Sequence, residues 1–275
     1  MSERIAALVA RALAEDLEPL GDLTSSLLPH DATVRAAIVP RRDGILAGKA
    51  LARETFRQVH PAIRTEWAAS DGEAVGAGRP VARVEGPLAA VLSAERTALN
   101  FLCHLSGIAT LTRTYVEAAR PARVRDTRKT TPGLRAVEKA AVRAGGGVNH
   151  RGSLSDGILV KDNHLGGLTI EEAVERARSR WPGRAVQIEC DTVDQVKTAL
   201  VAGADLVLLD NMVPAQVAGC VGLVRSSGRP CLVEVSGGVT LDNVAAYAAA
   251  GADLVAVGAL THSAPALDLG LDLLG

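Results

Sequence analysis

Residues 203–207 read Gly-Ala-Asp-Leu-Val, and the same five residues recur at 251–255. In each copy the glycine follows a stretch of helical periodicity, and the Leu-Val pair opens a short apolar run. A glycine that ends a helix immediately before a strand is typical of chains in which helices connect parallel strands. The repeat therefore predicts a parallel α/β fold in this part of the chain.

From about residue 122 onward, short apolar runs recur, and each one ends in a polar or charged cluster. These runs are residues 124–128, 158–162, 186–191, 206–211, 231–236 and 254–258. Helical patterns fill most of the gaps, for example at 171–180, 194–202, 215–225 and 242–250. Six β–α units in succession favour a complete or incomplete barrel of the TIM type, in which the chemistry lies at the carboxyl ends of the strands. An open doubly wound sheet is the alternative, although no Gly-x-Gly-x-x-Gly follows a strand.

The chain divides near residue 105. Residues 3–17 predict a short amphipathic helix, and residues 33–92 predict short antiparallel strands with a helix at about 48–59. Ser93 is expected to cap a longer helix that runs through Leu102.

Composition excludes several classes of protein. Hydrophobic residues make up 48% of the chain, aromatic residues 2%, and the net charge is −1, so a general nucleic-acid binder is not expected. No apolar run is long enough to span a membrane, and the acidic, amphipathic start is a poor signal peptide, so we expect a cytoplasmic protein. The four cysteines form no Cys-x-x-Cys pair, and we expect them to be small buried hydrophobes.

Positive charge is concentrated between residues 125 and 164, a segment that contains eight Arg or Lys residues and four Asp or Glu residues. Arg128, Lys129 and Lys161 come where predicted strands end, and charged groups half-buried there are costly without an anionic ligand. His150-Arg151 follows a glycine run at 145–147 and is expected to join this anion site. Lys139 and Arg143 are expected to be solvated on a helix.

Two further groups of residues lie at later strand ends. Glu189 and Asp210 end successive strands and could hold sugar hydroxyls or a hydrated Mg²⁺; structural ion pairs are the alternative. Ser236-Gly237-Gly238 and Gly258, with His262 nearby, follow the last two strands and predict a phosphate site. No Ser–His–Asp set or zinc pattern is present, so the chemistry should depend on positioning and electrostatics.

Several stretches together resemble the quinolinate phosphoribosyltransferase family, also called the carboxylating nicotinate-nucleotide pyrophosphorylases. The most specific are Asp126-Thr127-Arg128-Lys129-Thr130 and Asn149-His150-Arg151. The similarity covers essentially the whole chain, including residues 15–17, 21–25, 95–100, 105–110, 126–135, 147–151, 161–164, 189, 209–212 and 235–239.

This resemblance implies an N-terminal α/β sandwich domain at 1–105, joined by a C-terminal tail at 266–275, and an open six-stranded α/β barrel at 106–265. It also implies a homodimer, alone or within a higher oligomer, in which Arg96 completes the partner's active site. From the residues alone, Arg96 would be a solvated helix residue.

The implied reaction converts quinolinate and phosphoribosyl pyrophosphate into nicotinate mononucleotide, pyrophosphate and CO₂ with Mg²⁺, in de novo NAD biosynthesis. Lys129, Lys161, Glu189 and Asp210 would be catalytic, with Glu189 and Asp210 meeting the ribose and the Mg²⁺, largely through substrate and water. Substrate-binding residues would be Arg96, Thr127, Arg128, Lys129, His150, Arg151, Lys161, Glu189, Asp210, Ser236, Gly237, Gly238, Gly258 and His262.

Three alternatives remain. A relative associated with molybdate transport shares the implied fold, but would be expected to lack part of the set Arg128, His150, Arg151 and Lys161. A barrel lyase could use Lys161 as a Schiff base. A non-catalytic sensor of phosphorylated ligands would bind phosphoribosyl pyrophosphate without turnover.

Overall fold

The computed structural model describes residues 2–274 of the 275-residue chain. The chain forms two compact units, and the expected boundary at 105/106 falls inside the long helix α3 (Leu88–Ala118). The first unit contains the chain up to Leu111, Ala140–Gly146 and the chain from Ser263 onward, and the second contains Thr112–Lys139 and Gly147–His262.

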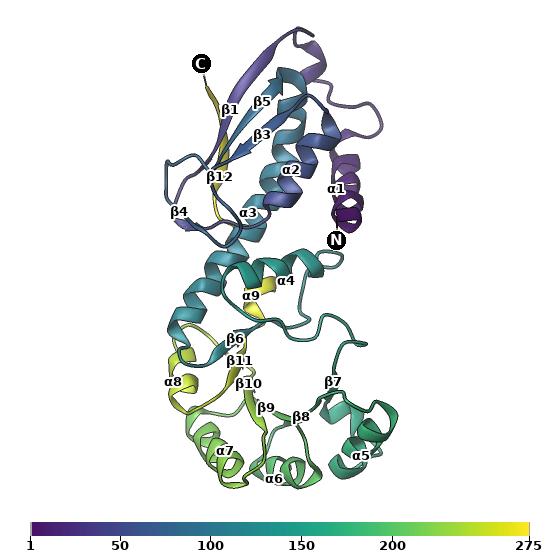
Figure 1. The fold of residues 1–275 in the computed structure, drawn as a ribbon, viewed down its shortest axis with the longest axis vertical. Helices are drawn as coiled ribbons and strands as arrows, with labels where there is room; N and C mark the ends of the chain where they lie inside the picture. Colours follow the sequence, from purple (N-terminus) through teal and green to yellow (C-terminus); the bar gives the residue numbers. More distant parts are fainter. Residues whose placement is uncertain (1, 275) are drawn as a thin grey trace. The chain divides into compact units, whose positions relative to one another are not determined.

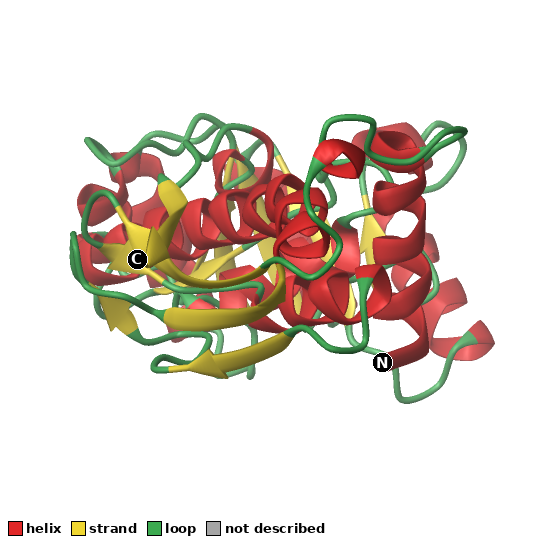
Figure 2. Ribbon diagram, turned by 90° about the horizontal axis from the view of Figure 1, so that it is seen from above, coloured by secondary structure: helices red, strands yellow, loops and turns green. Residues whose placement is uncertain are grey.

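The first unit is built on an antiparallel sheet with the strand order β12 (Leu269–Leu274), β1 (Thr33–Pro40), β5 (Ala82–Pro87) and β3 (Arg64–Trp67). Strands β2 (Gly44–Ile45) and β4 (Ala74–Val75) form a separate pair. Helices α1 (Ser2–Leu17) and α2 (Lys49–Val59) and α3 as far as Leu111 also belong to this unit, and the sheet forms a distinct layer beside helices (Figures 1 and 2). Burial alternates along β5, so one face of the strand packs on a core that includes Ile38, Phe56 and Leu99.

Helix α3 begins five residues earlier than the predicted cap at Ser93, at Leu88 directly after β5. Ser93 therefore lies inside the helix, where its hydroxyl donates to the carbonyl of Ala89 at 2.9 Å and to the carboxylate of Asp22 at 2.8 Å. The prediction was wrong because a serine within a helix can bond to the preceding turn instead of starting a new one.

The second unit is a six-stranded parallel sheet with the order β6 (Arg123–Arg125), β11 (Leu254–Ala256), β10 (Leu232–Ser236), β9 (Leu206–Asp210), β8 (Val186–Cys190) and β7 (Ile158–Val160). The strands form an arc with β6 and β7 at its two ends, which confirms an open six-stranded barrel (Figure 1). Helices α5 (Ile170–Arg180), α6 (Val193–Ala202), α7 (Pro214–Ser226) and α8 (Val244–Ala249) lie outside the arc. Helices α4 (Arg135–Ala144) and α9 (Ala259–His262) follow β6 and β11.

The repeated Gly-Ala-Asp-Leu-Val segment has a structural explanation. Gly203 and Gly251 adopt left-handed φ angles of 86° and 92° after their helices. Asp205 then accepts the backbone N–H of Val186 at 2.6 Å and pairs with Arg178. Asp253 accepts the N–H of Val233 at 2.8 Å and pairs with Arg225. In each copy the aspartate fixes the start of the neighbouring strand.

Side chains alternate between the two faces of the barrel sheet. Val207 on β9 and Val233 and Val235 on β10 are fully buried. The residues that alternate with them, Leu208 and Glu234, line the barrel interior. The register pairs Asp210 with Ser236 and places Leu208 between Glu189 and Glu234. Polar side chains at neighbouring strand ends therefore converge. Within residues 2–274, no helix is both long and apolar enough to cross a membrane.

Candidate active site

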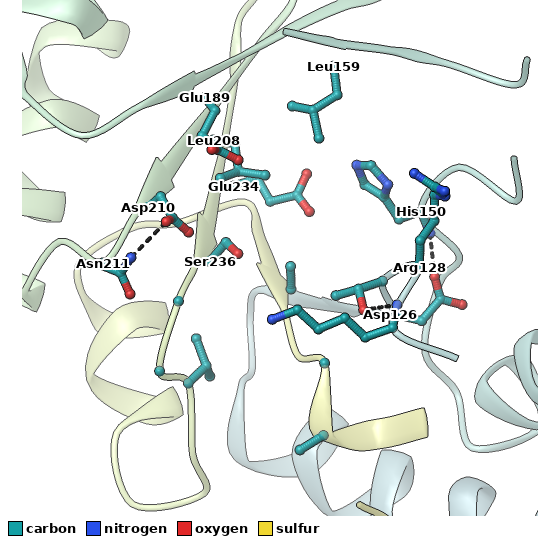
Figure 3. Close-up of a pocket in the computed structure, with 18 of the residues that line it drawn as sticks. Asp126, Arg128, His150, Leu159, Glu189, Leu208, Asp210, Asn211, Glu234 and Ser236 are labelled. Atoms are coloured by element: carbon teal, nitrogen blue, oxygen red, sulfur yellow. Dashed lines mark hydrogen bonds between the residues drawn. The ribbon is translucent and has the colours of Figure 1, made fainter. Parts of the chain in front are cut away.

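A pocket of about 700 Å³ opens at the carboxyl ends of the barrel strands (Figure 3). This volume lies within the usual range for small-molecule sites. Every predicted substrate-binding residue except Arg96 lines it, namely Thr127, Arg128, Lys129, His150, Arg151, Lys161, Glu189, Asp210, Ser236, Gly237, Gly238, Gly258 and His262. Arg96 belongs to the first unit, where it is exposed on α3.

Lys161 and Glu189 form an ion pair between the ends of β7 and β8. The Glu189 side chain is 8% exposed and that of Lys161 is 42% exposed. The ion pair that was the alternative role for Glu189 is therefore present, yet both side chains also line the pocket. The carboxylate fixes the position of an ammonium group that a ligand can reach.

The loops after β9 and β10 pack closely and are hydrogen-bonded to each other. Asn211 has a φ of 56°, and its N–H donates to the carbonyl of Ser236 at 2.9 Å. Its side-chain amide donates to Asp210 at 2.7 Å. Gly237 has a φ of 87°, and a Cβ there would lie 2.2 Å from Oδ1 of Asn211. Only glycine fits at this point, so the backbone remains open to the pocket.

The loop after β6 is held against α9. The hydroxyl of Thr261 donates to the carbonyl of Lys129 at 2.8 Å, and the N–H of Lys129 donates to Thr127 at 3.0 Å. A Cβ on Gly258 would lie 3.1 Å from Nε2 of His262 and 3.2 Å from Cδ of Lys129. Lys129, which the resemblance implies to be catalytic, and the predicted phosphate loop are therefore neighbours.

Three cations of the pocket remain uncompensated. Among residues 2–274, no carboxylate forms an ion pair with Arg128, Lys129 or Arg151. Burial lowers the pKa of Arg151, and the nearby charge of Arg128 lowers it further. Lys161 is half-buried as expected, whereas Arg128 and Lys129 are exposed, which corrects the expectation for those two. Such a group of cations attracts a multiply charged anion.

Lys139 is not solvated, and that prediction was wrong. It is 5% exposed and pairs with the fully buried Asp126, whereas Arg143 is exposed as expected. Asp126 also accepts the backbone N–H of His150 at 2.8 Å and the amide of Asn149. A buried carboxylate needs such partners, and here they fix the segment that carries His150.

The sequence-based prediction missed the polar residues deep in the barrel. Glu234 is fully buried on β10, and one of its carboxylate oxygens accepts from Nη1 of Arg125 and from Nε2 of Gln187, both at 2.7 Å. Oε1 of Gln187 lies 3.0 Å from Nε2 of His150. The available signal was a glutamate two residues before Ser236 in an otherwise apolar strand, which places both on the interior face.

The carboxylates suit a metal ion that arrives with its ligand. Within residues 2–274, no group of three or more His, Cys, Asp or Glu side chains is placed to hold a metal ion. Glu189 and Asp210 each have one oxygen engaged by Lys161 or Asn211. They could therefore supply few ligands, which fits a hydrated Mg²⁺ held mainly by phosphate oxygens and does not fit a structural zinc site.

Open α/β barrels whose strands end at a pocket lined by polar and charged side chains form a class of proteins that bind small molecules at this edge of the sheet. This chain has those properties. Residues 108–272 match the model of the quinolinate phosphoribosyl transferase C-terminal domain, and residues 22–106 match that of the N-terminal domain. The chain belongs to the quinolinate phosphoribosyltransferase family.

Individual relatives agree with this result. The chain is 41% identical over 271 residues to the carboxylating nicotinate-nucleotide pyrophosphorylase of Mycobacterium leprae, covering 96% of this chain and 95% of that protein. It is 40% identical to a probable enzyme of the same name from Bacillus subtilis, with 92% and 88% coverage. The nicotinate-nucleotide pyrophosphorylase structure from Francisella tularensis superposes with a TM-score of 0.95 at 36% identity, covering 100% of this chain and 97% of that one.

Proposed function

We propose that this protein is a quinolinate phosphoribosyltransferase of NAD biosynthesis. The observation that carries the proposal is a pocket in which the glycine loop Ser236-Gly237-Gly238, two strand-end carboxylates and three cations without ion-pair partners meet. Quinolinate brings two carboxylates, and phosphoribosyl pyrophosphate brings a 5′-phosphate and a pyrophosphate. Both substrates match the charge and the chemistry of the pocket lining.

The reaction would proceed through two changes of bonding. The lone pair of the pyridine nitrogen attacks the anomeric carbon, the bond from that carbon to the pyrophosphate oxygen breaks, and pyrophosphate departs. The new ring nitrogen is cationic, so the electrons of the bond to the 2-carboxylate can be drawn into the ring. CO₂ leaves, the ring carbon takes up a proton, and the product is nicotinate mononucleotide.

Each part of the pocket has a proposed role. Arg128, His150, Arg151 and Lys161 would bind the carboxylates of quinolinate. Lys129 would stabilise negative charge on the leaving pyrophosphate, and Glu189 would support positive charge developing at the anomeric carbon. Thr127 would contact substrate beside Arg128 and Lys129. The loop Ser236-Gly237-Gly238, with Gly258 and His262, would hold the 5′-phosphate.

The proposal includes Mg²⁺ bound with phosphoribosyl pyrophosphate. Asp210 and Glu189 would hold it together with the ribose hydroxyls, and the ion would neutralise charge on the pyrophosphate. It further includes a homodimer in which Arg96 reaches the partner's pocket, and a cytoplasmic location. The exposure of Arg96 on α3 is compatible with such a role.

The alternatives have less support. The residues expected to be lost in a molybdate-associated relative are present in the pocket. A Schiff-base lysine must be available as a neutral amine, whereas Lys161 is ion-paired with Glu189.

A direct assay tests the proposal. Purified protein receives Mg²⁺ and phosphoribosyl pyrophosphate, with either quinolinate or nicotinate as the acceptor, and nicotinate mononucleotide is quantified. We expect product from quinolinate only. Binding of phosphoribosyl pyrophosphate without turnover would favour the sensor, and equal use of nicotinate would exclude the proposed specificity.

A further inference from the structure

Four residues form a hydrogen-bonded network beneath the pocket, which we call the inner network: Arg125, Glu234, Gln187 and His150. They come from β6, β10, β8 and the segment before β7, so the network spans the barrel interior. Glu234 and His150 also line the pocket, and the Glu234 carboxylate points toward the imidazole ring (Figure 3). None of the proposed roles above uses Glu234, Gln187 or Arg125.

Hydrogen-bonding rules determine the direction of each bond in the inner network. Glu234 is ion-paired with Arg125, so its carboxylate can only accept. Gln187 must therefore present its NH₂ group to Glu234, which leaves its oxygen facing His150. An amide oxygen cannot donate, so Nε2 of His150 must carry the hydrogen.

The backbone of His150 is fixed independently, because its N–H donates to the buried Asp126 and its carbonyl accepts from Lys139. Among residues 2–274, Nδ1 of His150 has no protein hydrogen-bond partner. The ring is therefore held at one nitrogen, and the other nitrogen remains for a ligand.

Burying the Glu234 carboxylate destabilises the folded protein, so packing alone does not explain why a glutamate occupies this position. The side chain is fully buried, and its second oxygen, Oε1, has no hydrogen-bond partner among the described residues. A fully buried carboxylate with an unpartnered oxygen is destabilising. Burial also lowers the pKa of His150, and Arg125 and Arg151 act in the same direction, whereas the charge of Glu234 raises it.

We propose that Glu234, acting through Gln187, is a positioning residue that holds the Nε2–H of His150 and directs Nδ1 to the pocket, where Nδ1 takes up a proton from solvent when an anionic carboxylate binds and then donates a hydrogen bond to that carboxylate. The claim that Nδ1 meets the substrate rests on the proposed function. The claim that the inner network fixes the tautomer of the His150 ring does not. The role predicts an effect on quinolinate binding and none on phosphoribosyl pyrophosphate binding.

The test combines NMR of ¹⁵N-histidine-labelled protein with kinetics for Glu234→Gln, Gln187→Met and the control Glu175→Gln, whose residue is exposed on α5. The His150 signal is identified by its loss in His150→Gln. We expect the Nε2–H tautomer in the native protein and the control, and a mixture of tautomers in both network variants. Glu234→Gln should also lower the pKa of His150 measured by titration, since it removes a negative charge.

In turnover, both network variants should raise KM for quinolinate on the order of tenfold, as expected for one lost charge-assisted contact, with KM for phosphoribosyl pyrophosphate unchanged. Gln187→Met retains the ion pair of Glu234, so it provides the test if Glu234→Gln does not fold. An Nδ1–H tautomer in the native protein, or network variants with unaltered tautomer and KM, would overturn the inference. If the protein shows no turnover but the network variants still shift the tautomer of His150, the proposed function is refuted. The inference that the inner network positions His150 then still stands.

Discussion

Gly237 is a pocket residue whose backbone conformation and close neighbour Asn211 leave no room for a side chain. Its φ is 87°, and a Cβ would overlap the Asn211 side chain, whereas neighbouring Gly238 has a φ of 58° and open space around it. We predict that Gly237→Ala raises KM for phosphoribosyl pyrophosphate on the order of tenfold and destabilises the protein by about 2 kcal/mol or more.

Gly238→Ala is the matched control, because it carries the left-handed backbone cost of roughly 1–2 kcal/mol without the overlap. Steady-state kinetics and urea unfolding of both variants make the comparison. Equal effects on KM in the two variants would show that the fit against Asn211 is unimportant.

His150 provides a prediction about pH. Burial lowers its folded-state pKa below the ordinary value of 6.5. As the pH falls through that value, the unfolded chain binds a proton at this residue before the folded protein does, so the free energy of unfolding decreases. Urea unfolding at about pH 7.5 and about pH 5.5 should show a larger loss of stability for the native protein than for His150→Gln. An equal or smaller loss would contradict the assigned burial effect.

Among the elements, the buried pair between Lys139 on α4 and Asp126 after β6 joins a helix to the edge of the sheet that carries the pocket. Removing one partner leaves an uncompensated buried charge. We predict that Lys139→Met lowers the free energy of unfolding by about 3–5 kcal/mol in urea titrations. Lys197→Met, which removes an exposed pair with Asp194, should change it by less than about 0.5 kcal/mol. Similar effects would mean that Asp126 is stabilised by its other donors.

The sequence predicted the strand ends correctly, but it did not predict the surroundings of Lys139 or the role of Glu234. Strand ends could be located because each apolar run ends in polar residues, and this placed Lys161, Glu189 and Asp210 in the pocket. Lys139 was misjudged because periodicity gives the face of a helix, but not the buried acid that the face meets. Glu234 was overlooked because an apolar strand does not reveal whether its interior face is packed or polar.

At the scale of the whole molecule, Arg96 is the residue that only family resemblance could identify. An exposed arginine on a helix is normally solvated, so its sequence context alone predicts no contact with substrate. If sites are shared in a dimer, Arg96→Ala subunits mixed with Lys161→Ala subunits should restore one intact site per mixed dimer. Random mixing should then recover about a quarter of native activity. No recovery in mixed dimers verified by mass spectrometry would count against the role of Arg96 across an interface.

The central claim is that this barrel couples phosphoribosyl transfer to loss of one carboxylate, and isotopic stoichiometry tests it most directly. Quinolinate labelled with ¹³C in its 2-carboxylate is supplied with phosphoribosyl pyrophosphate and Mg²⁺, and nucleotide, pyrophosphate and CO₂ are quantified together. We predict equal amounts of the three products, with all the label in CO₂ and none in the nucleotide. Label retained in the nucleotide, or pyrophosphate released without CO₂, would contradict the claim.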